Sequence, residues 1–238
     1  MSKTIDLTGL RGGMVVSCQA YPGDATYGSE IMVRFALAAL EGGALAIRAN
    51  SPPDISAIKQ AVKVPVIGLW KRVYADSDVY ITATRADAMA VVTAGADIVA
   101  LDATARRRPG GESLQEVVSY LKRETDALLM ADVSTLEEGI QAERLGFDIV
   151  STTLSGYTPY SPQTSDPDYA LIAALSRSIR VPVFAEGRIH TPEQARRCLE
   201  NGAHTVVVGT ALTRPHVMTR KFVDEISHVR DRSQVERG

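Results

Sequence analysis

The sequence predicts a (β/α)8 barrel, first because one helix–strand unit recurs along the chain. Three segments superimpose: TRADAMAVVTAGADIVALD (84–102), TLEEGIQAERLGFDIVSTT (135–153) and TPEQARRCLENGAHTVVVGT (191–210). Each begins with Thr, has Ala or Gly four residues on and Gly eleven residues on, and then enters a β-branched run. Thr caps a helix by accepting hydrogen bonds from its free N–H groups, and Gly ends it in a left-handed conformation.

The second observation is that the expected strands hardly alternate. DIVAL, TVVVG and VPVIGLW are near-continuous apolar runs, typical of parallel strands buried on both faces. We expect strands at 14–19, 44–49, 65–70, 97–102, 127–132, 148–153, 181–186 and 204–209. We expect helices at 29–42, 54–62, 84–94, 112–124, 135–145, 168–177, 191–201 and 215–229. Eight strand–helix pairs in 238 residues favour a single-domain α/β protein, a (β/α)8 (TIM) barrel.

An open doubly wound sheet is the alternative fold, since it also alternates strands and helices. Such a sheet would usually carry a Gly-rich dinucleotide-binding turn after its first strand, and SCQAYPGDATYGSE (17–30) is not one. We therefore expect residues 1–230 to form one barrel domain. The last residues, 231–238 (DRSQVERG), are expected to be a disordered tail.

Composition excludes several classes of function. The net charge of −2 gives no general attraction to nucleic acid or to an anionic membrane. No apolar run approaches the roughly eighteen residues of a membrane helix, and the first residues lack the apolar centre of a signal peptide. The two cysteines, Cys18 and Cys198, fit no disulfide framework or metal spacing. We expect a cytoplasmic protein with neither nucleic acid nor membrane as a partner.

Nearly every expected strand ends on a polar residue or glycine. These residues are Gln19, Arg48, Lys71, Asp102, Asp132, Thr153, Glu186 and Gly209-Thr210. In a barrel the strand ends converge on one pocket, and the longer connections 71–83, 103–111 and 154–167 would cover that same face. A carboxylate that follows a buried strand, as Glu186 does, is therefore expected to face a ligand.

The loops after the last two strands predict a phosphate site. EGR (186–188) follows strand seven and GTALTRP (209–215) follows strand eight, and many barrels bind phosphate there through backbone N–H groups. Gly187 and Gly209 would allow a close approach, and Arg188 or Arg214 would add charge-assisted bonds. The alternative is two turn glycines with incidental arginines.

Lys71 closes the apolar run VPVIGLWK and has two functional interpretations. It is either a Schiff-base nucleophile or a general acid/base beside the positive charge of Arg72. The alternative is a lysine that reaches solvent. Glu186 is the candidate for a second proton-transfer group. Asp132 either orients Lys71, binds a sugar hydroxyl or caps the fifth helix.

Other charged residues give weaker indications of a function. Asp102 either contacts a substrate or orders the basic loop after it, and Arg106, Arg107 and Arg108 are interpreted as a solvated run rather than a binding site. None of the four histidines, His190, His204, His216 and His228, pairs with another histidine or a carboxylate at ligand spacing on adjacent strand ends. We therefore expect no metal.

Several motifs resemble the N-acetylmannosamine-6-phosphate 2-epimerases of bacterial sialic-acid catabolism. They are SCQA (17–20), AIRAN (46–50), PVIGLWKR (65–72), ALDAT (100–104), LMADVST (129–135), AEGRIHTPEQA (185–195) and VVVGTALTRP (206–215). The similarity runs from about residue 10 to about residue 225. It implies interconversion of N-acetylmannosamine 6-phosphate and N-acetylglucosamine 6-phosphate, without a metal or a redox cofactor.

The resemblance also implies roles for individual residues. In the open-chain sugar, carbon 2 lies next to the aldehyde, so its proton can be removed to give an enolate and returned to the opposite face. The resemblance makes Lys71 and Glu186 the catalytic pair. Gln19, Arg48, Asp132 and Thr153 match positions expected to hold the sugar and its acetamido group. Gly187, Arg188, Gly209, Thr210 and Arg214 match the phosphate site.

Three rival functions remain open. They are a Schiff-base aldolase or synthase acting on a phosphosugar, a metal-dependent ketose-phosphate 3-epimerase, and a phosphosugar-binding barrel without catalysis. The presence of both Lys71 and Glu186 argues against the last. A homodimer is also plausible, because the last helix, RPHVMTRKFVDEISHVR (214–230), is amphipathic and many barrels pair through helix faces.

Overall fold

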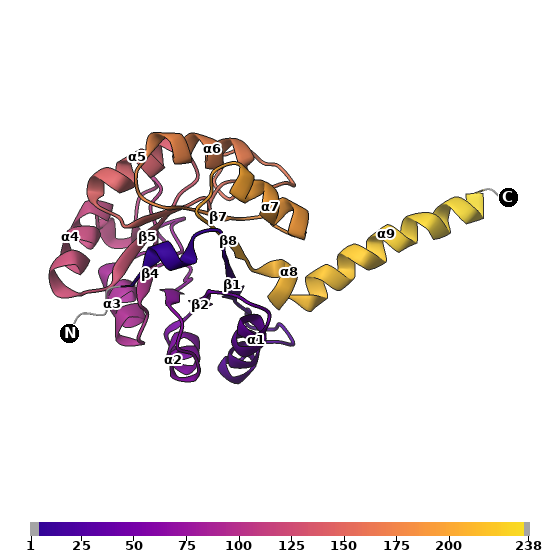
Figure 1. The fold of residues 1–238 in the computed structure, drawn as a ribbon, viewed down its shortest axis with the longest axis horizontal. Helices are drawn as coiled ribbons and strands as arrows, with labels where there is room; N and C mark the ends of the chain where they lie inside the picture. Colours follow the sequence, from indigo (N-terminus) through magenta and orange to yellow (C-terminus); the bar gives the residue numbers. More distant parts are fainter. Residues whose placement is uncertain (1–4, 236–238) are drawn as a thin grey trace.

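The computed structural model describes residues 5–235 and confirms the barrel. Eight strands, all parallel, follow one another around a closed ring in chain order (Figure 1). The strands are β1 Met14–Cys18, β2 Ala46–Asn50, β3 Val66–Leu69, β4 Ile98–Asp102, β5 Leu128–Asp132, β6 Ile149–Ser151, β7 Val183–Glu186 and β8 Thr205–Val208.

Helices surround the ring as the repeated unit predicts. They are α1 Ser29–Glu41, α2 Pro52–Ala61, α3 Arg85–Thr93, α4 Leu114–Glu124, α5 Leu136–Leu145, α6 Tyr169–Ser178, α7 Pro192–Glu200, α8 Thr210–Thr213 and α9 Pro215–Val235. Thr84, Thr135 and Thr191 each cap a helix through a bond from a backbone N–H three residues on. Gly146 ends α5 in the left-handed region, with φ of 89°.

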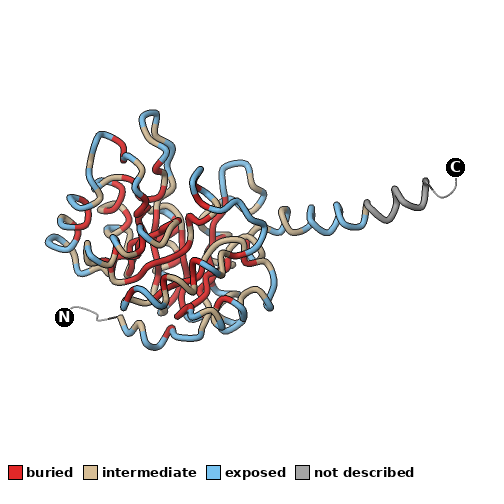
Figure 2. Tube along the Cα trace, turned by 90° about the horizontal axis from the view of Figure 1, so that it is seen from above, coloured by how far each residue is buried: buried red, intermediate tan, exposed pale blue. Residues whose placement is uncertain are grey.

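The C-terminal segment differs from the expectation of one helix over 215–229. A short helix, α8, precedes α9, and Arg214, whose backbone is not helical, separates the two helices. The backbone of α9 is helical up to Val235, so residues 231–235 differ from the expected disordered tail, and residues 236–238 lie outside the described part of the chain. Figures 1 and 2 show α9 pointing away from the barrel.

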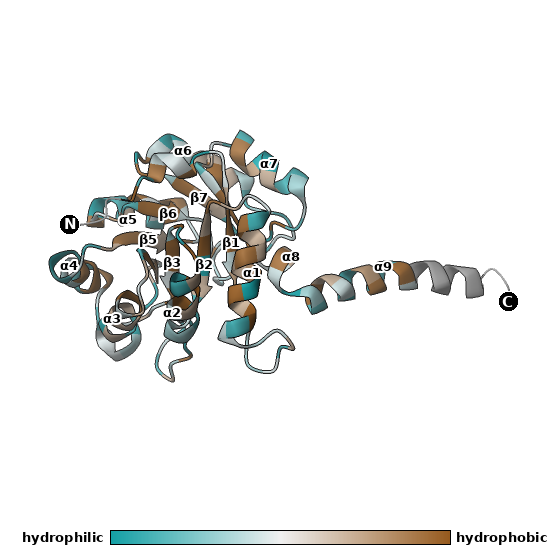
Figure 3. Cartoon of the chain, turned by 60° about the horizontal axis from the view of Figure 1, so that its bottom comes forward, coloured by the Kyte–Doolittle hydropathy of each residue, from teal (hydrophilic) through white to brown (hydrophobic). Residues whose placement is uncertain are grey.

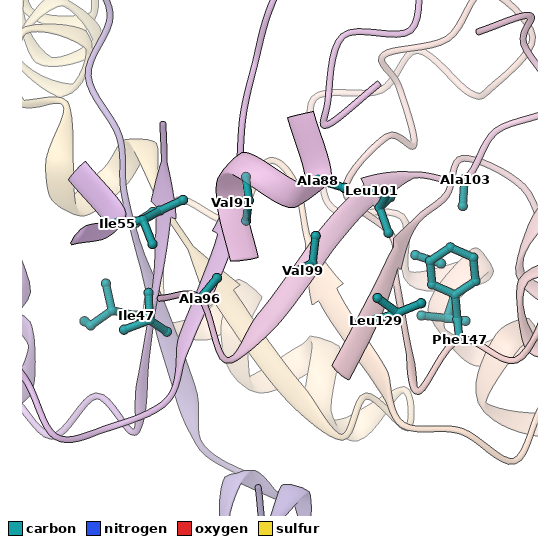
Figure 4. Packing of buried hydrophobic residues seen from close by; sticks show 14 of the residues in the cluster. Ile47, Ile55, Ala88, Val91, Ala96, Val99, Leu101, Ala103, Leu129 and Phe147 are labelled. Atoms are coloured by element: carbon teal, nitrogen blue, oxygen red, sulfur yellow. The ribbon is translucent and has the colours of Figure 1, made fainter. Parts of the chain in front are cut away.

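Two apolar layers hold the barrel together. Val99 and Leu101 point outward from β4 and pack with Ile55, Val91 and other residues of the surrounding helices (Figure 4). Alternate residues point inward, and this inner layer includes Val15, Ile67, Ile98, Met130, Phe184 and Val207. Buried residues accordingly concentrate in the strands (Figure 2).

A 3-10 helix, η1 Leu7–Leu10, packs against the inner layer through Leu10. The carbonyl group of Leu10 accepts a hydrogen bond of 2.9 Å from Thr205 Oγ1, at the first residue of β8. This contact places η1 at the N-terminal end of the barrel. A second 3-10 helix, η2 Pro109–Gly111, follows β4. Because η1 lies at the N-terminal end of the barrel, a ligand can enter at the C-terminal ends of the strands.

Candidate active site

A cavity of about 250 Å³ lies at the C-terminal ends of the strands. Its lining includes both predicted catalytic residues, all predicted phosphate-binding residues and two predicted sugar-binding residues: Gln19, Lys71, Thr153, Glu186, Gly187, Arg188, Gly209, Thr210 and Arg214. Lys71 follows β3 and Glu186 ends β7, and these strands lie four places apart in a closed ring of eight. The two groups therefore enter the cavity from opposite sides of the barrel mouth.

Lys71 is held by uncharged partners. Its Nζ donates to Gln19 Oε1 at 2.6 Å and to the hydroxyl of Tyr21 at 3.0 Å. Gln19 is fixed in turn, because its Nε2 donates to Ser17 Oγ at 2.6 Å. The backbone N–H of Lys71 donates to Asn50 Oδ1 at 2.8 Å. The side chain is thus positioned at the cavity without a carboxylate partner among these contacts.

Arg72 does not lie beside the Lys71 ammonium group in the way the sequence suggested. Its guanidinium forms an ion pair of 2.8 Å with the buried Asp87 of α3 and lies 4.6 Å from the ring centre of Trp70. The charge of Arg72 is therefore compensated on the helix side of the strand. Adjacency in sequence misled here because the two side chains leave the backbone in different directions.

Glu186 is partly exposed, with 13% of its side chain accessible. Its Oε2 lies 3.1 Å from Nη1 of Arg48 and accepts a hydrogen bond of 3.0 Å from Thr153 Oγ1. Burial raises the pKa of Glu186 above its usual value, opposed by the charge of Arg48 and reinforced by that of Asp132. The carboxyl group at the end of this buried strand is thus able to hold a proton at higher pH than a solvated glutamate.

Arg48 and Asp132 lie behind the cavity lining, with fully buried side chains. The Arg48 guanidinium binds Asp132 through two parallel contacts of 3.1 and 2.6 Å. Arg48 stands in the middle of β2 rather than at its end, because the strand continues to Asn50. The proposal that Asp132 caps the fifth helix is wrong, since Thr135 caps α5. The side-chain hydrogen bonds of Asp132 go to Arg48 and Thr153, not to Lys71.

The loops after β7 and β8 approach the cavity with their backbones. Gly187 has φ of 109°, a conformation that disfavours any residue with a side chain. A Cβ atom at Gly209 would lie 3.2 Å from Cβ of Ser17, so glycine allows β1 and this loop to pack closely. Gly209 precedes α8, and the first N–H groups of a helix, here beginning at Thr210, have no acceptor within the helix.

Both arginines of these loops line the cavity, and each also contacts a neighbouring segment through hydrogen bonds or an ion pair. Arg188 donates through Nε to the carbonyl group of Asp166 at 2.8 Å and through Nη1 to that of Ser155. Arg214 lies 3.3 Å from a carboxylate oxygen of Asp24 and 4.9 Å from the ring centre of Tyr21. An anion bound here would share Arg214 with Asp24.

Asp102 orders the basic loop after β4. Its fully buried carboxylate forms an ion pair of 2.7 Å with Arg106. Arg108 is 3% exposed and donates to three backbone carbonyl groups, at residues 82, 83 and 102. The interpretation of this run as solvated is therefore wrong for Arg106 and Arg108, whose donors are satisfied inside the protein.

Several residues at the cavity were missed by the sequence reasoning. Tyr21 contacts both Lys71 and Arg214, and its place two residues after Gln19 was a usable signal. Tyr80 and Tyr157 also line the cavity but belong to the long loops after β3 and β6. The path of such loops depends on tertiary contacts, so no local pattern indicates where their side chains point.

The described residues also bear on the expectations about metal and membrane. No group of three or more His, Cys, Asp or Glu side chains within the described residues could hold a metal ion. In the same part of the chain, no helix combines the length and apolar character needed to cross a membrane. Both cysteines are free and buried, and burial raises the pKa of each thiol to about 12.

A parallel barrel with a lysine and a glutamate facing one polar cavity at the strand ends has the architecture of a (β/α)8-barrel enzyme. Residues 32–228 match the model of the NanE family, described as "Putative N-acetylmannosamine-6-phosphate epimerase". The chain belongs to this family.

Individual relatives are similar in sequence to this chain over nearly its whole length. A protein named "Putative N-acetylmannosamine-6-phosphate 2-epimerase" from Caldanaerobacter subterraneus subsp. tengcongensis is 54% identical over 222 residues, covering 93% of this chain and 94% of the relative. A relative of the same name from Cutibacterium acnes is 49% identical over 222 residues, covering 92% and 96%.

Solved structures give the same picture. The N-acetylmannosamine-6-phosphate 2-epimerase from Clostridium perfringens superimposes with a TM-score of 0.89 and 47% identity, covering 92% of this chain and 95% of that one. Thiamine phosphate pyrophosphorylase from Pyrococcus furiosus, with a TM-score of 0.57 and 19% identity, shares the fold alone.

Proposed function

We propose that the chain interconverts N-acetylmannosamine 6-phosphate and N-acetylglucosamine 6-phosphate by moving the proton on carbon 2 from one face to the other. Membership of the epimerase family supports the reaction. The observation that carries the mechanism is the placement of Lys71 and Glu186 across one cavity. A two-base inversion at a carbon uses one proton-transfer group on each face, and strands on opposite sides of a barrel can present such groups.

Lys71 is the proposed group for removal of the carbon-2 proton. Its Nζ contacts neutral oxygens of Gln19 and Tyr21. A lysine held this way can lose and regain its proton without breaking an ion pair with a carboxylate. Glu186 is the second proton-transfer group, on the opposite face. Its raised pKa, caused mainly by burial, suits a carboxyl group that must carry a proton during part of the cycle.

The remaining lining residues are proposed to bind the substrate. Gln19 offers its amide group to the open-chain sugar, whereas the hydroxyl of Thr153 contacts Glu186. The phosphate is assigned to the loops after β7 and β8, through Gly187, Arg188, Gly209, Thr210 and Arg214. The carbonyl group of the open-chain sugar itself acidifies the proton on carbon 2, so the proposed chemistry requires neither a metal nor a redox cofactor.

The test is an NMR assay in heavy water with each of the two phosphosugars as the starting compound. The proposal expects deuterium at carbon 2 and an approach to the same mixture from either side. A barrel that only binds phosphosugar would give neither. Reduction by borohydride that traps a covalent adduct on Lys71 would instead favour an aldolase or synthase using a Schiff base.

We also propose that two copies of the chain associate through α9. Phe222, Val223 and Ile226 of this helix are 68%, 53% and 57% exposed, and Figure 3 shows hydrophobic residues along the projecting helix. A second copy is the proposed partner, because most soluble oligomers are symmetric homo-oligomers. We place the reaction in the cytoplasm, a location supported by the two free cysteines.

A further inference from the structure

One hydroxyl group lies between two carboxyl groups at the wall of the cavity. Thr153 Oγ1 is 2.7 Å from Oδ1 of Asp132, 3.0 Å from Oε2 of Glu186 and 2.8 Å from Oγ of Ser151, whose hydroxyl is able to donate to it. A threonine hydroxyl carries a single proton, so it can donate to only one of these oxygens at a time. Which contact is a hydrogen bond therefore depends on where the protons of the carboxyl groups are.

The orientation of this hydroxyl follows the protonation state of Glu186. When Glu186 is ionised, Thr153 donates to it, and Oδ1 of Asp132 still accepts from Arg48 at 3.1 Å. When Glu186 carries a proton, it donates to Thr153 Oγ1, and Thr153 donates to Asp132. In the ionised state Oδ1 of Asp132 therefore faces Thr153 Oγ1 without a proton between them, whereas in the protonated state each of the two contacts has a donor.

The two carboxyl groups differ in burial and therefore in role. Asp132 is fully buried and engages both nitrogens of the Arg48 fork, so a molecule in the cavity does not reach it. Glu186 is 13% exposed at the cavity and receives a single contact from Arg48. Glu186 is therefore the group that exchanges protons with a bound molecule.

The same burial argues against contact between the sugar and the Arg48–Asp132 pair. Neither side chain has any accessible surface, so a ligand filling the cavity would meet Thr153 and Glu186 first. The resemblance places Arg48 and Asp132 among sugar-binding positions, but their contacts in the structure run to Glu186 and Thr153.

We propose that Thr153 is a hydrogen-bond switch for Glu186, and that Arg48 and Asp132 are positioning residues that act through Glu186 rather than on the sugar. This inference rests on the proposed function, in which Glu186 gains and loses a proton once in each turnover. It adds that the Thr153 hydroxyl is the contact that adjusts when this mostly buried carboxyl group gains or loses its proton.

Other groups also face Glu186 and enter any pH dependence. Arg48 of β2, Lys71 after β3 and Asp132 of β5 act on it through their charges. Further titratable or charged groups line the same cavity: Tyr21, Tyr80, Arg188, His190 and Arg214. The variants that test the switch must therefore leave these groups in place.

The test is the titration of Glu186 itself, followed by carbon-13 NMR of protein labelled at the glutamate carboxyl carbons. The Glu186 signal is assigned by its absence from Glu186→Gln. Thr153→Val removes the hydroxyl at nearly constant shape and should raise the pKa of Glu186, because the ionised form loses its donor. Thr153→Ser keeps a hydroxyl and should restore the wild-type titration.

Asp132→Asn should move the same titration in the opposite direction. Removing the negative charge that faces Glu186 lowers the pKa of Glu186. Turnover should fall about tenfold or more in Thr153→Val, with KM within about threefold of wild type, since a positioning residue acts on the chemical step.

Two results would overturn the inference. One is an unchanged Glu186 titration in folded Thr153→Val. The other is a tenfold or greater rise in KM with unchanged turnover, which would make Thr153 a ligand of the sugar. If Asp132→Asn fails to fold, the Val and Ser variants of Thr153 still decide. The titration needs no activity, so failure of the switch is distinguishable from failure of the proposed reaction.

Discussion

Lys71 and Glu186 line one cavity from opposite sides of the barrel, the first following β3 and the second ending β7. Their surroundings differ. Lys71 Nζ is held by neutral oxygens, whereas Glu186 belongs to a cluster with Arg48, Asp132 and Thr153. Two proton-transfer groups in unlike environments suit a two-base inversion, in which one group accepts a proton while the other donates one.

Loss of the lysine should abolish most of the activity while leaving the fold intact. Lys71→Ala should lower turnover by about 10²–10⁴-fold, the usual effect of removing a positioned acid/base group. Lys63→Ala, at an exposed lysine before β3, is the matched control and should behave as wild type. Steady-state kinetics and thermal melting of both variants make the comparison. Near-normal turnover in Lys71→Ala would refute the role of this lysine.

The phosphate assignment predicts a defect in binding. Arg214→Ala should mainly raise KM, because the phosphate is held equally in the substrate and in the transition state. Asp24→Asn is the complementary variant, since it removes the carboxylate that forms an ion pair with Arg214. It should leave KM unchanged or lower it. A turnover defect without a change in KM in Arg214→Ala would show that the phosphate binds elsewhere.

The raised pKa of Glu186 predicts a pH-dependent cost in stability. A carboxyl group whose pKa is higher in the folded state stabilises the fold fully below its unfolded pKa. That contribution is lost as pH rises through the folded value. Glu186→Gln should therefore gain in Tm relative to wild type as pH rises from about 4 to 8.

An exposed glutamate provides the control for this effect. Glu193→Gln, on α7, should show no such trend, because this side chain lies at the surface. Melting curves followed by circular dichroism across that pH range are sufficient. A constant difference in Tm between wild type and Glu186→Gln at all pH values would contradict the environment described for Glu186.

The proposed association through α9 can be tested by placing charge on its apolar face. Ile226→Lys should weaken the dimer about tenfold or more, because a buried unpaired charge is costly. Asp224→Lys introduces the same side chain two positions away on the same helix, at an exposed polar site, and should have a smaller effect. Light scattering over a concentration series measures both. A wild-type monomer at every concentration would end this proposal.

Local chemistry made much of the fold predictable. The Thr caps, the glycines that end helices and the unbroken apolar runs act within a few residues, so the strands and helices could be placed from sequence. The barrel then brought the strand ends together, which gathered Lys71 and Glu186 at one cavity. The start of α9 at Pro215 was also predictable, because the residue before a proline disfavours helix, whereas the short helix α8 before it was not among the expected helices.

Tertiary contacts decided the features that were not predictable. Arg108 is buried because it donates to the carbonyl groups of Thr82 and Ala83 in a distant segment and to that of Asp102, and a run of three arginines carries no sign of that. Arg48 and Asp132 could be listed as polar residues near strand ends. Their pairing behind the cavity, out of reach of solvent, depends on the closure of the barrel.

The central claim is that Lys71 and Glu186 act on the same carbon from opposite faces. Carbon-2 exchange in heavy water by each single variant tests it most directly. Glu186→Gln should exchange the proton of one epimer only, and Lys71→Met that of the other epimer only, both without net epimerisation. Exchange of both epimers at comparable rates by either single variant would show that one group serves both faces, contrary to this account.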